Sequence, residues 1–527
     1  MFSFIARRLS VLVVILLGSS FGTYCLAAIS ADPLDALRTS SAKNKAALIA
    51  QLTRELDLDT PPPLRYFKWL QGVIAGLWGK FDLGKSRSGQ SVQELLGTAI
   101  PTTLRLVAAA TLFAIIVGVT IGVITALRQY SRFDYSVTFV SFLFFSLPVF
   151  WVAVLLKQYL AIGFNDWLSH YDENGNPDGG VVSLPFLIGI SIAVGIFWVG
   201  VLGGDKKRIL SVFGISAGAT AAVLVLLSWT HWFVQPTLGP IFVLFMGTSL
   251  ALVTVLASTG LGNRASVYTA GSMVALGMVV YFPIQLLFTK DFSALMLLVL
   301  AVLTIAVGLT AGYFIAKEDR PAVMRTGAIT AFLVAVLIFA DRIMQSWKPY
   351  VEFSSIAGRP VPTVGQTNSE LNDELALNPD FWLSTLDGLM HIILPTIALT
   401  LISFAGYVRY TRGSLLEVLN MDYIRTARAK GLSERTVLMR HAFRNALIPL
   451  TTLMVWDIAG LVGGAVITES VFGWSGMGTL FLQGVAGYDL NLLMSVILIT
   501  SGLALLANLA ADLLYSALDP RIRIGGK

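Results

Sequence analysis

One stretch of the sequence has the spacing of a phosphate-binding loop. Residues 79–86 read GKFDLGKS and match the pattern G-x-x-x-x-G-K-[ST]. A working loop of this kind follows a buried strand, opens a helix and needs an acidic partner for Mg²⁺ after a second strand. The flanking residues provide none of this context. We therefore expect no nucleotide to bind here, and we expect no ATP or Mg²⁺ to be bound by this chain.

Residue types that bind metals or act as nucleophiles are few and scattered. Cys25 is the one cysteine of the chain, which excludes an intrachain disulfide and a cysteine metal cluster. No H-E-x-x-H motif is present. The histidines are His170, His231, His391 and His441. Their spacing does not indicate a metal site, so we expect no bound metal and no enzyme activity of this chain.

The most polar long run between two strongly apolar segments extends from Asp422 to Pro449. Its basic residues are Arg425, Arg428, Lys430, Arg435, Arg440 and Arg444. Its acidic residues are Asp422 and Glu434. A short run with this excess of positive charge is typical of a loop on the cytoplasmic side of a membrane.

This run predicts two short helices joined by a glycine hinge. Apolar residues recur at roughly helical spacing from Leu415 to Ala427, which indicates an amphipathic helix. Gly431 interrupts the pattern, and Ser433 can cap a second helix that extends to about Asn445. An element of this kind, lying across the membrane plane, could occupy a cleft in a partner protein.

The small and basic residues of this run form a candidate docking surface. Small side chains permit close approach, and Arg and Lys can pair with acidic groups of a partner. The candidate residues are Arg425, Thr426, Ala427, Arg428, Ala429, Lys430, Gly431, Ser433, Glu434, Arg440 and His441. Two alternatives stay open: the small residues let the two helices pack together, or the basic charge holds the loop near anionic lipid.

Asp457 lies within an apolar segment. A charged group at the middle of a membrane costs about 2.5–3.5 kcal/mol. Such residues usually face a cavity or another helix. Asp457 is therefore a candidate pathway residue that contacts an amine of the transported molecule, and equally a candidate for an interhelical hydrogen bond.

The composition assigns these residues to membrane-spanning helices and the loops between them. Of 527 residues, 55% are hydrophobic and 13% are charged, with a mean hydropathy of +0.75. A soluble protein has about 25% charged residues. Apolar runs near the length of a membrane span recur along the chain, and their continuous apolar character excludes the alternating pattern of a β-barrel. The predicted fold class is an all-α polytopic membrane protein.

We predict twelve spans with both termini on the inside. They cover about 9–29, 101–127, 136–163, 185–202, 210–229, 239–259, 268–288, 293–315, 326–343, 391–409, 447–468 and 491–515. The net charge of +6 lies mainly in short loops on one side, as the positive-inside rule requires, and does not indicate nucleic-acid binding. Lys157, Asp341 and Arg342 lie near the predicted outer ends of spans and are expected to reach the interface.

Several segments resemble the dipeptide and oligopeptide branch of ABC-transporter permeases. In the run DYIRTARAKGL, residues 425–427 stand in the family's Glu-Ala-Ala positions, and Gly431 stands in the position of its glycine. RHAFRNALIP, ending at Pro449, and FDLGKS at 81–86 are also similar to this branch. Residues 463–478 are similar too, although Ser475 replaces a usual proline, and the tail at 519–521 has the branch's ending.

The resemblance covers residues 1–163 and 386–527. It implies a six-span core of the type I ABC-importer fold, with an external loop at 31–100 and an ATPase-docking loop at 412–446. Residues 164–385 have no counterpart in the family and form an insertion of about six spans and an external loop at 344–385. Its default interpretation is an accessory region that is structural, binds a partner or faces lipid.

The resemblance also implies function and partners. It indicates the permease subunit of an importer of di- or oligopeptides in the bacterial cytoplasmic membrane, in contact with membrane lipid. A second homologous permease, two ABC ATPase subunits that carry ATP and Mg²⁺, and an extracytoplasmic solute-binding protein are expected as partners. Dipeptides, longer peptides, glutathione and nickel complexes all stay open as substrates.

The alternative is a twelve-span secondary transporter driven by an ion gradient. Such transporters are built from internal repeats and carry ionisable residues near the middle of the membrane. This sequence shows no repeat between its halves and few ionisable residues within its spans. The ABC permease is therefore the favoured interpretation.

Overall fold

The computed structural model describes residues 2–30, 32–39, 44–169, 179–317 and 319–518. These residues form helices and loops, and their only β pairing is an isolated bridge between Lys85 and Ser91. The predicted all-α class is confirmed. The tail motif at 519–521 lies outside the described residues.

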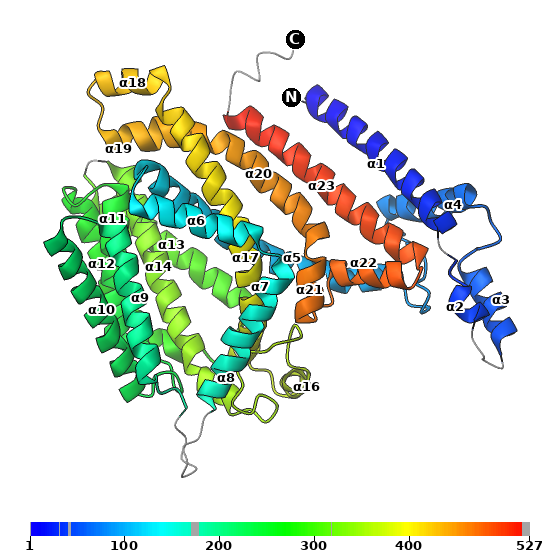
Figure 1. Cartoon of the computed structure of the whole chain (residues 1–527), viewed down its shortest axis with the longest axis horizontal. Helices are drawn as coiled ribbons and strands as arrows, with labels where there is room; N and C mark the ends of the chain where they lie inside the picture. Colours follow the sequence, from blue (N-terminus) through cyan, green and yellow to red (C-terminus); the bar gives the residue numbers. More distant parts are fainter. Residues whose placement is uncertain (1, 31, 40–43, 170–178, 318, 519–527) are drawn as a thin grey trace. The chain divides into compact units, whose positions relative to one another are not determined.

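The chain divides into two compact units (Figure 1). Unit 1 contains residues 1–158, 364–366 and 392–527, and unit 2 contains residues 159–363 and 367–391. These boundaries come from compactness alone, so the predicted division of the chain into 1–163, 164–385 and 386–527 stays a prediction.

Unit 1 contains the helices that carry the candidate site. Those of its first segment are α1 (Phe2–Ser30), α2 (Asp35–Arg38), α3 (Lys45–Glu55), α4 (Pro62–Ala75), α5 (Val92–Leu127), α6 (Arg132–Ser146) and α7 (Val149–Leu156). Those of its last segment are most of α17 (Phe381–Leu419), α18 (Asp422–Ala429), α19 (Glu434–Thr436), α20 (Phe443–Gly464), α21 (Val466–Phe472), α22 (Met477–Ala486) and α23 (Leu490–Leu518). An aromatic cluster of Tyr24, Tyr66 and Trp69 joins α1 to α4.

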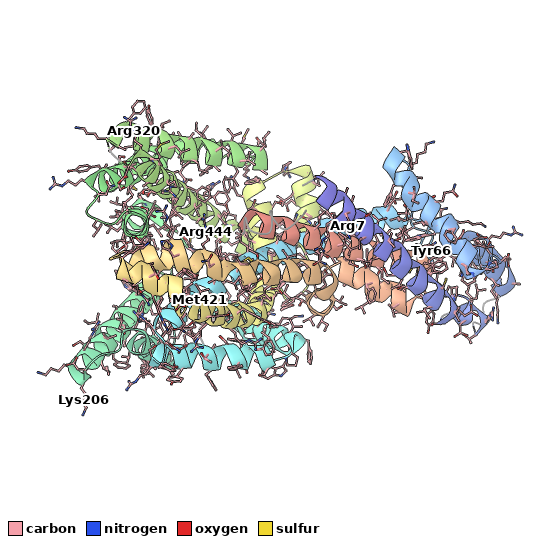
Figure 2. The ribbon with its side chains drawn as sticks, turned by 90° about the horizontal axis from the view of Figure 1, so that it is seen from above. Arg7, Tyr66, Lys206, Arg320, Met421 and Arg444 are labelled. Carbon is pink, nitrogen blue, oxygen red and sulfur yellow. The ribbon has the colours of Figure 1, made fainter. Side chains whose placement is uncertain are left out.

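Unit 2 is a bundle of long apolar helices. They are α8 (Gly163–Leu168), α9 (Leu184–Leu202), α10 (Lys206–Trp229), α11 (Gly239–Ser258), α12 (Arg264–Leu287), α13 (Ala294–Ile315), α14 (Arg320–Gln345), α15 (Trp347–Val351), α16 (Ser369–Leu377) and the first turns of α17. Lys206 and Arg320 mark the N-terminal ends of α10 and α14 (Figure 2). A Cβ at Gly308 would lie 2.5 Å from the Gly327 carbonyl oxygen, so these glycines allow α13 and α14 to approach closely.

Among the described residues, ten helices are long and apolar enough to cross a membrane. An eleventh candidate consists of α6 together with the helical segment Val149–Leu168, bent by 103°. α20 occupies the position of the eleventh predicted span. The chain is therefore a multi-pass membrane protein, and the count of twelve stays a prediction.

The predicted span at 136–163 is bent, because the chain breaks at Leu147 and Pro148, and whether it crosses the membrane as one span stays a prediction. Proline disfavours the helical conformation of the residue before it, and Leu147 is extended with φ −85° and ψ 133°. The Lys157 Nζ donates to the Val471 carbonyl oxygen at 2.8 Å, at the last turn of α21, and its position at the interface stays a prediction.

Asp341 was expected at the interface, but its side chain is fully buried in unit 2. Its carboxylate accepts bonds from the Tyr281 hydroxyl at 2.6 Å, from the Leu238 and Gly239 N–H groups at 2.7 and 3.0 Å, and from Gln345 at 2.9 Å. These bonds connect the start of α11 with α12 and α14. Burial of a carboxylate is tolerated here because four donors are hydrogen-bonded to it.

Asp341→Ala is expected to destabilise unit 2 by about 3 kcal/mol or more, because each buried donor left without an acceptor costs about 1–3 kcal/mol. Asp341→Asn keeps one acceptor and should cost less. The unfolding temperature of the purified protein in detergent measures both variants. If the alanine variant melts at the wild-type temperature, Asp341 does not hold these helices together.

Candidate docking site and its connection to the spans

The candidate docking segment begins where α17 ends. Asn420 and Met421 separate α17 from α18, and Gly431 follows α18 with φ +75°, a conformation that glycine adopts without strain. The Ser433 hydroxyl then accepts the Thr436 N–H at 3.4 Å and caps α19. Figure 1 shows α18 and α19 as two short neighbouring helices at one end of α17 and α20. The predicted glycine hinge and serine cap are confirmed.

Two details of the predicted helices are wrong. The amphipathic pattern from Leu415 to Ala427 does not form one helix, because the chain turns at residues 420–421. The second helix does not end near Asn445, because α19 continues through a π-helical segment at Val437–Ala442 into α20. Burial of apolar residues on both sides of Pro449 keeps the helix continuous despite the hydrogen bond that proline removes.

The inward face of α18 is apolar and buried. Ile424 and Ala427 are 0% and 6% exposed. They pack in a cluster with residues of α5, α17 and the following helix: Ala126, Leu415, Val418, Val437, Ala442 and Ala446. Ala427 therefore belongs to internal packing and not to the exposed surface, because a larger side chain there would meet this cluster.

The outward face of the segment is basic. Of the candidate docking residues, the exposed ones are Arg425, Thr426, Arg428, Ala429, Lys430, Gly431, Ser433, Glu434 and Arg440, and His441 is half-buried. Met421, before α18, and Arg444, on α20, are exposed as well (Figure 2). No observation identifies what these residues bind, so their docking role stays a prediction.

One ion pair crosses the glycine hinge. An Arg428 NH2 group lies 2.6 Å from a Glu434 carboxylate oxygen, and the Arg428 Nε lies 3.2 Å from the other. This contact lowers the pKa of Glu434, so any stabilisation it gives is present at neutral pH and is lost as the pH falls through that lowered pKa. Both side chains are exposed, and exposed pairs contribute little.

Asp457 on α20 is half-buried, and the buried Tyr407 hydroxyl of α17 has no hydrogen-bond partner among the described atoms. Tyr407 is 0% exposed and packs against Gly118 of α5, where a Cβ would lie 2.5 Å from the Tyr407 Cβ. The interhelical hydrogen bond of Asp457 stays a prediction. Its role in a pathway stays a prediction.

The sequence analysis did not identify Glu469 as an organising residue. Its carboxylate is fully buried and accepts the Thr103 hydroxyl at 2.5 Å and the Thr479 N–H at 3.1 Å. It thereby caps the N-terminus of α22 and connects it to α5, while burial raises the pKa of Glu469. Gly476 provides the space, since a Cβ there would lie 2.3 Å from a Glu469 oxygen. The glycines of WSGMG, residues 474–478, are the sequence feature that could have indicated this close packing around Glu469.

Glu469→Ala is expected to lower the free energy of unfolding by about 2–4 kcal/mol, because two buried donors lose their acceptor. Glu469→Gln should cost less, since it keeps one acceptor and similar volume. Thermal unfolding in detergent tests this order. Equal losses for the two variants would contradict the capping role.

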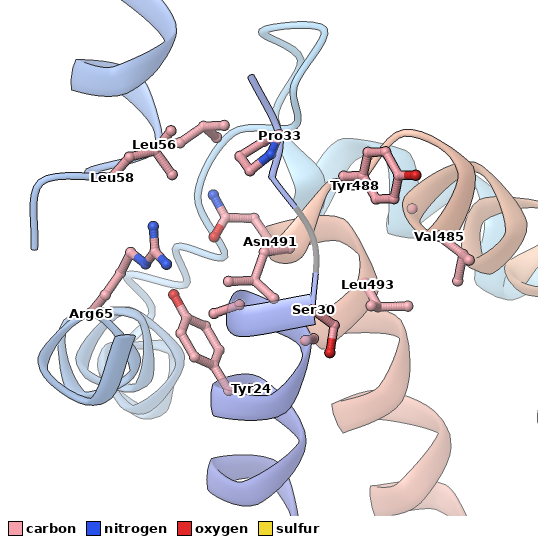
Figure 3. Close-up of a pocket in the computed structure, with 14 residues that line it drawn as sticks. Tyr24, Ser30, Pro33, Leu56, Leu58, Arg65, Val485, Tyr488, Asn491 and Leu493 are labelled. Atoms are coloured by element: carbon pink, nitrogen blue, oxygen red, sulfur yellow. The ribbon is translucent and has the colours of Figure 1, made fainter. Parts of the chain in front are cut away.

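A pocket of about 260 Å³ lies in unit 1, between α1, α4, the turn at 56–58 and the connection from α22 to α23 (Figure 3). Its polar lining residues are Tyr24, Ser30, Arg65, Tyr488 and Asn491. The Arg65 Nε is buried without a hydrogen-bond partner among the described atoms. Tyr488, also in the lining, has φ +53°, a strained conformation for this residue. The arginine suits a small group with a negative charge.

The GKFDLGKS segment lacks the structure of a phosphate-binding loop. Gly79 follows a short 3₁₀ helix, and the next helix begins only at Val92. The Lys85 carbonyl oxygen accepts a bond from Asn491 at 3.0 Å, and the Ser86 hydroxyl bonds to Ser88 at 2.6 Å. The bond from Asn491 fixes the segment against α23.

Comparison with known proteins matches both ends of the chain to one kind of transport protein. Residues 327–524 match the family of binding-protein-dependent transport system inner membrane components. Residues 1–107 match the N-terminal domain of the same system's membrane component.

Curated relatives include the oligopeptide transport system permease protein OppB of Mycobacterium tuberculosis, 38% identical over 193 residues, which are 37% of this chain and 55% of the relative. AppB of Bacillus subtilis, also an oligopeptide permease protein, is 44% identical over 146 residues, 28% of this chain and 46% of the relative. The dipeptide permease protein DppB of Escherichia coli is 43% identical over 138 residues, 26% of this chain and 41% of the relative. The chain thus spans about half the length of these relatives.

Proposed function

We propose that this chain is the permease subunit of an ATP-driven importer of di- or oligopeptides. Its residues 1–107 and 327–524 belong to the family of inner membrane components of binding-protein-dependent transport systems. The observation that carries the proposal is the segment from α18 to α19. Its apolar face is buried against α5 and α17, and its basic face is exposed. An element built in this way can receive a partner's movement on one side and pass it to the spans on the other.

The partners follow from the same proposal. The exposed face of α18 and α19 binds an ABC ATPase subunit, which carries ATP and Mg²⁺, while this chain binds no cofactor. A second homologous permease completes the pathway, with one ATPase for each permease. An extracytoplasmic binding protein delivers the peptide to the outer loops, where the Arg65 pocket can accept an acidic side chain. Both termini of the chain then lie in the cytoplasm.

The ion-driven transporter has no observation in its favour, since the relatives are permease proteins of transport systems with other components. Purification of the tagged chain from native membranes, followed by mass spectrometry, tests the proposal. We expect an ABC ATPase and a second permease to co-purify, and deletion of the gene to abolish uptake of a labelled dipeptide or oligopeptide. A chain that purifies alone and transports in liposomes with only an ion gradient would overturn the proposal.

A further inference from the structure

An ion pair between the buried Asp134 and the half-buried Arg412 joins α6 to α17. The Arg412 Nε donates to one Asp134 carboxylate oxygen at 2.7 Å, and an Arg412 NH2 group donates to the other at 2.9 Å. Asp134 is 1% exposed. Two parallel N–H···O bonds between a guanidinium and a carboxylate fix both the distance and the angle between the groups that they connect.

Asp134 also holds the turn that leads from α5 into α6. Its carboxylate accepts the Tyr130 N–H at 3.0 Å, and Tyr130 has φ +61°, a strained conformation for this residue. The Asp134 N–H in turn donates to the Ser131 hydroxyl at 3.1 Å, which caps α6. One carboxylate therefore orders the α5–α6 turn and attaches it to α17.

The same turn is connected to the docking segment by a second route. Ala126, at the end of α5, lies in the buried cluster that contains Ile424 and Ala427 of α18. Arg412 lies on α17 about two turns before that helix ends at Leu419. The ion pair and the apolar cluster thus attach the end of α5, the start of α6 and the docking segment to the same part of α17.

We infer that Asp134 and Arg412 are positioning residues that pass movement of the docking segment to α5 and α6. This inference rests on the proposed function. Replacing a buried ion pair by apolar residues is often neutral or stabilising, so such a pair is weak evidence for stability alone. The two parallel hydrogen bonds between Asp134 and Arg412 instead make the α5–α6 turn and α17 rotate as one body. This rotation occurs when a partner binds two conformations of the chain with different affinity.

Three substitutions test the inference in the full complex purified from native membranes. Asp134→Asn and Arg412→Gln remove the charge pair, and Arg412→Lys keeps the charge but loses the planar two-point contact. We expect peptide uptake to fall at least about tenfold in the first two and severalfold in Arg412→Lys. The amount of co-purified ATPase should stay near the wild-type level. The number of ATP molecules hydrolysed per peptide transported should therefore rise, because uptake falls while the ATPase stays bound.

Arg208→Gln is the matched control, because it removes an exposed arginine of α10, outside the docking segment, and uptake should change little. If uptake, ATPase recovery and chain abundance all fall together in Arg412→Lys, the pair has only a static structural role. If uptake is unchanged in the variants, the pair passes no movement. Failure of the proposed function is a separate result, because then the wild-type chain recovers no ATPase at all.

Discussion

Replacing Arg425 and Lys430 together by glutamate is expected to reduce the ATPase recovered with this chain at least about tenfold, a change of about 1.4 kcal/mol in binding free energy. Both side chains are exposed on the outward face of the docking segment. Their reversal places negative charges against the acidic groups proposed for the partner, and like charges across an interface cost several kcal/mol. Quantitative mass spectrometry of the complex, purified at fixed salt, measures the loss.

The control reverses the same number of charges away from the docking segment. Lys206 and Lys207, at the start of α10, are also exposed, so Lys206→Glu with Lys207→Glu changes the net charge equally. This variant should recover the wild-type amount of ATPase. Equal losses in both variants would show that net charge, and not this surface, controls recovery. Unchanged recovery in the docking variant would contradict the assignment of the surface.

The sequence alone predicted the polar features of the docking segment, because they depend on local chemistry. Gly431 adopts a positive φ and Ser433 caps a helix, as their residue types predict. The role of Ala427 was not predictable in the same way. Its burial depends on Ala126, which is distant in the sequence, and only the fold brings the two residues into one cluster.

Long-range partners also explain the other differences between prediction and structure. Spans were located from apolar runs, and most of them are helices at the expected positions. Hydropathy cannot reveal hydrogen-bond partners that lie on another helix. Such partners are found for Asp341, Lys157 and Glu469. Hydropathy placed Asp341 at the interface, whereas its hydrogen bonds keep its side chain inside the protein.

The contact between α5 and α17 depends on two glycines one turn apart on α5. A Cβ at Gly118 would lie 2.5 Å from the Tyr407 Cβ, and one at Gly122 would lie 2.6 Å from the Thr411 Cβ. Small residues four apart let two membrane helices approach closely. On α17 this contact involves Tyr407 and Thr411, and Thr411 directly precedes Arg412 of the ion pair with Asp134. The proposed movement therefore passes through a part of the fold that has no room for a larger residue.

Gly122→Ala is expected to destabilise unit 1 by about 1–3 kcal/mol, because the added methyl group overpacks a contact made by Cβ and backbone atoms that cannot rotate away. Gly413→Ala is the control on α17, since nothing lies within 4 Å of the position of its Cβ. There the change should be neutral or stabilise by up to about 1 kcal/mol, because alanine favours a helix more than glycine does. Unfolding temperatures in detergent separate the two variants. Identical temperatures would mean that α5 and α17 are free to separate, in which case neither the ion pair nor the glycines could carry movement from the docking segment into the spans.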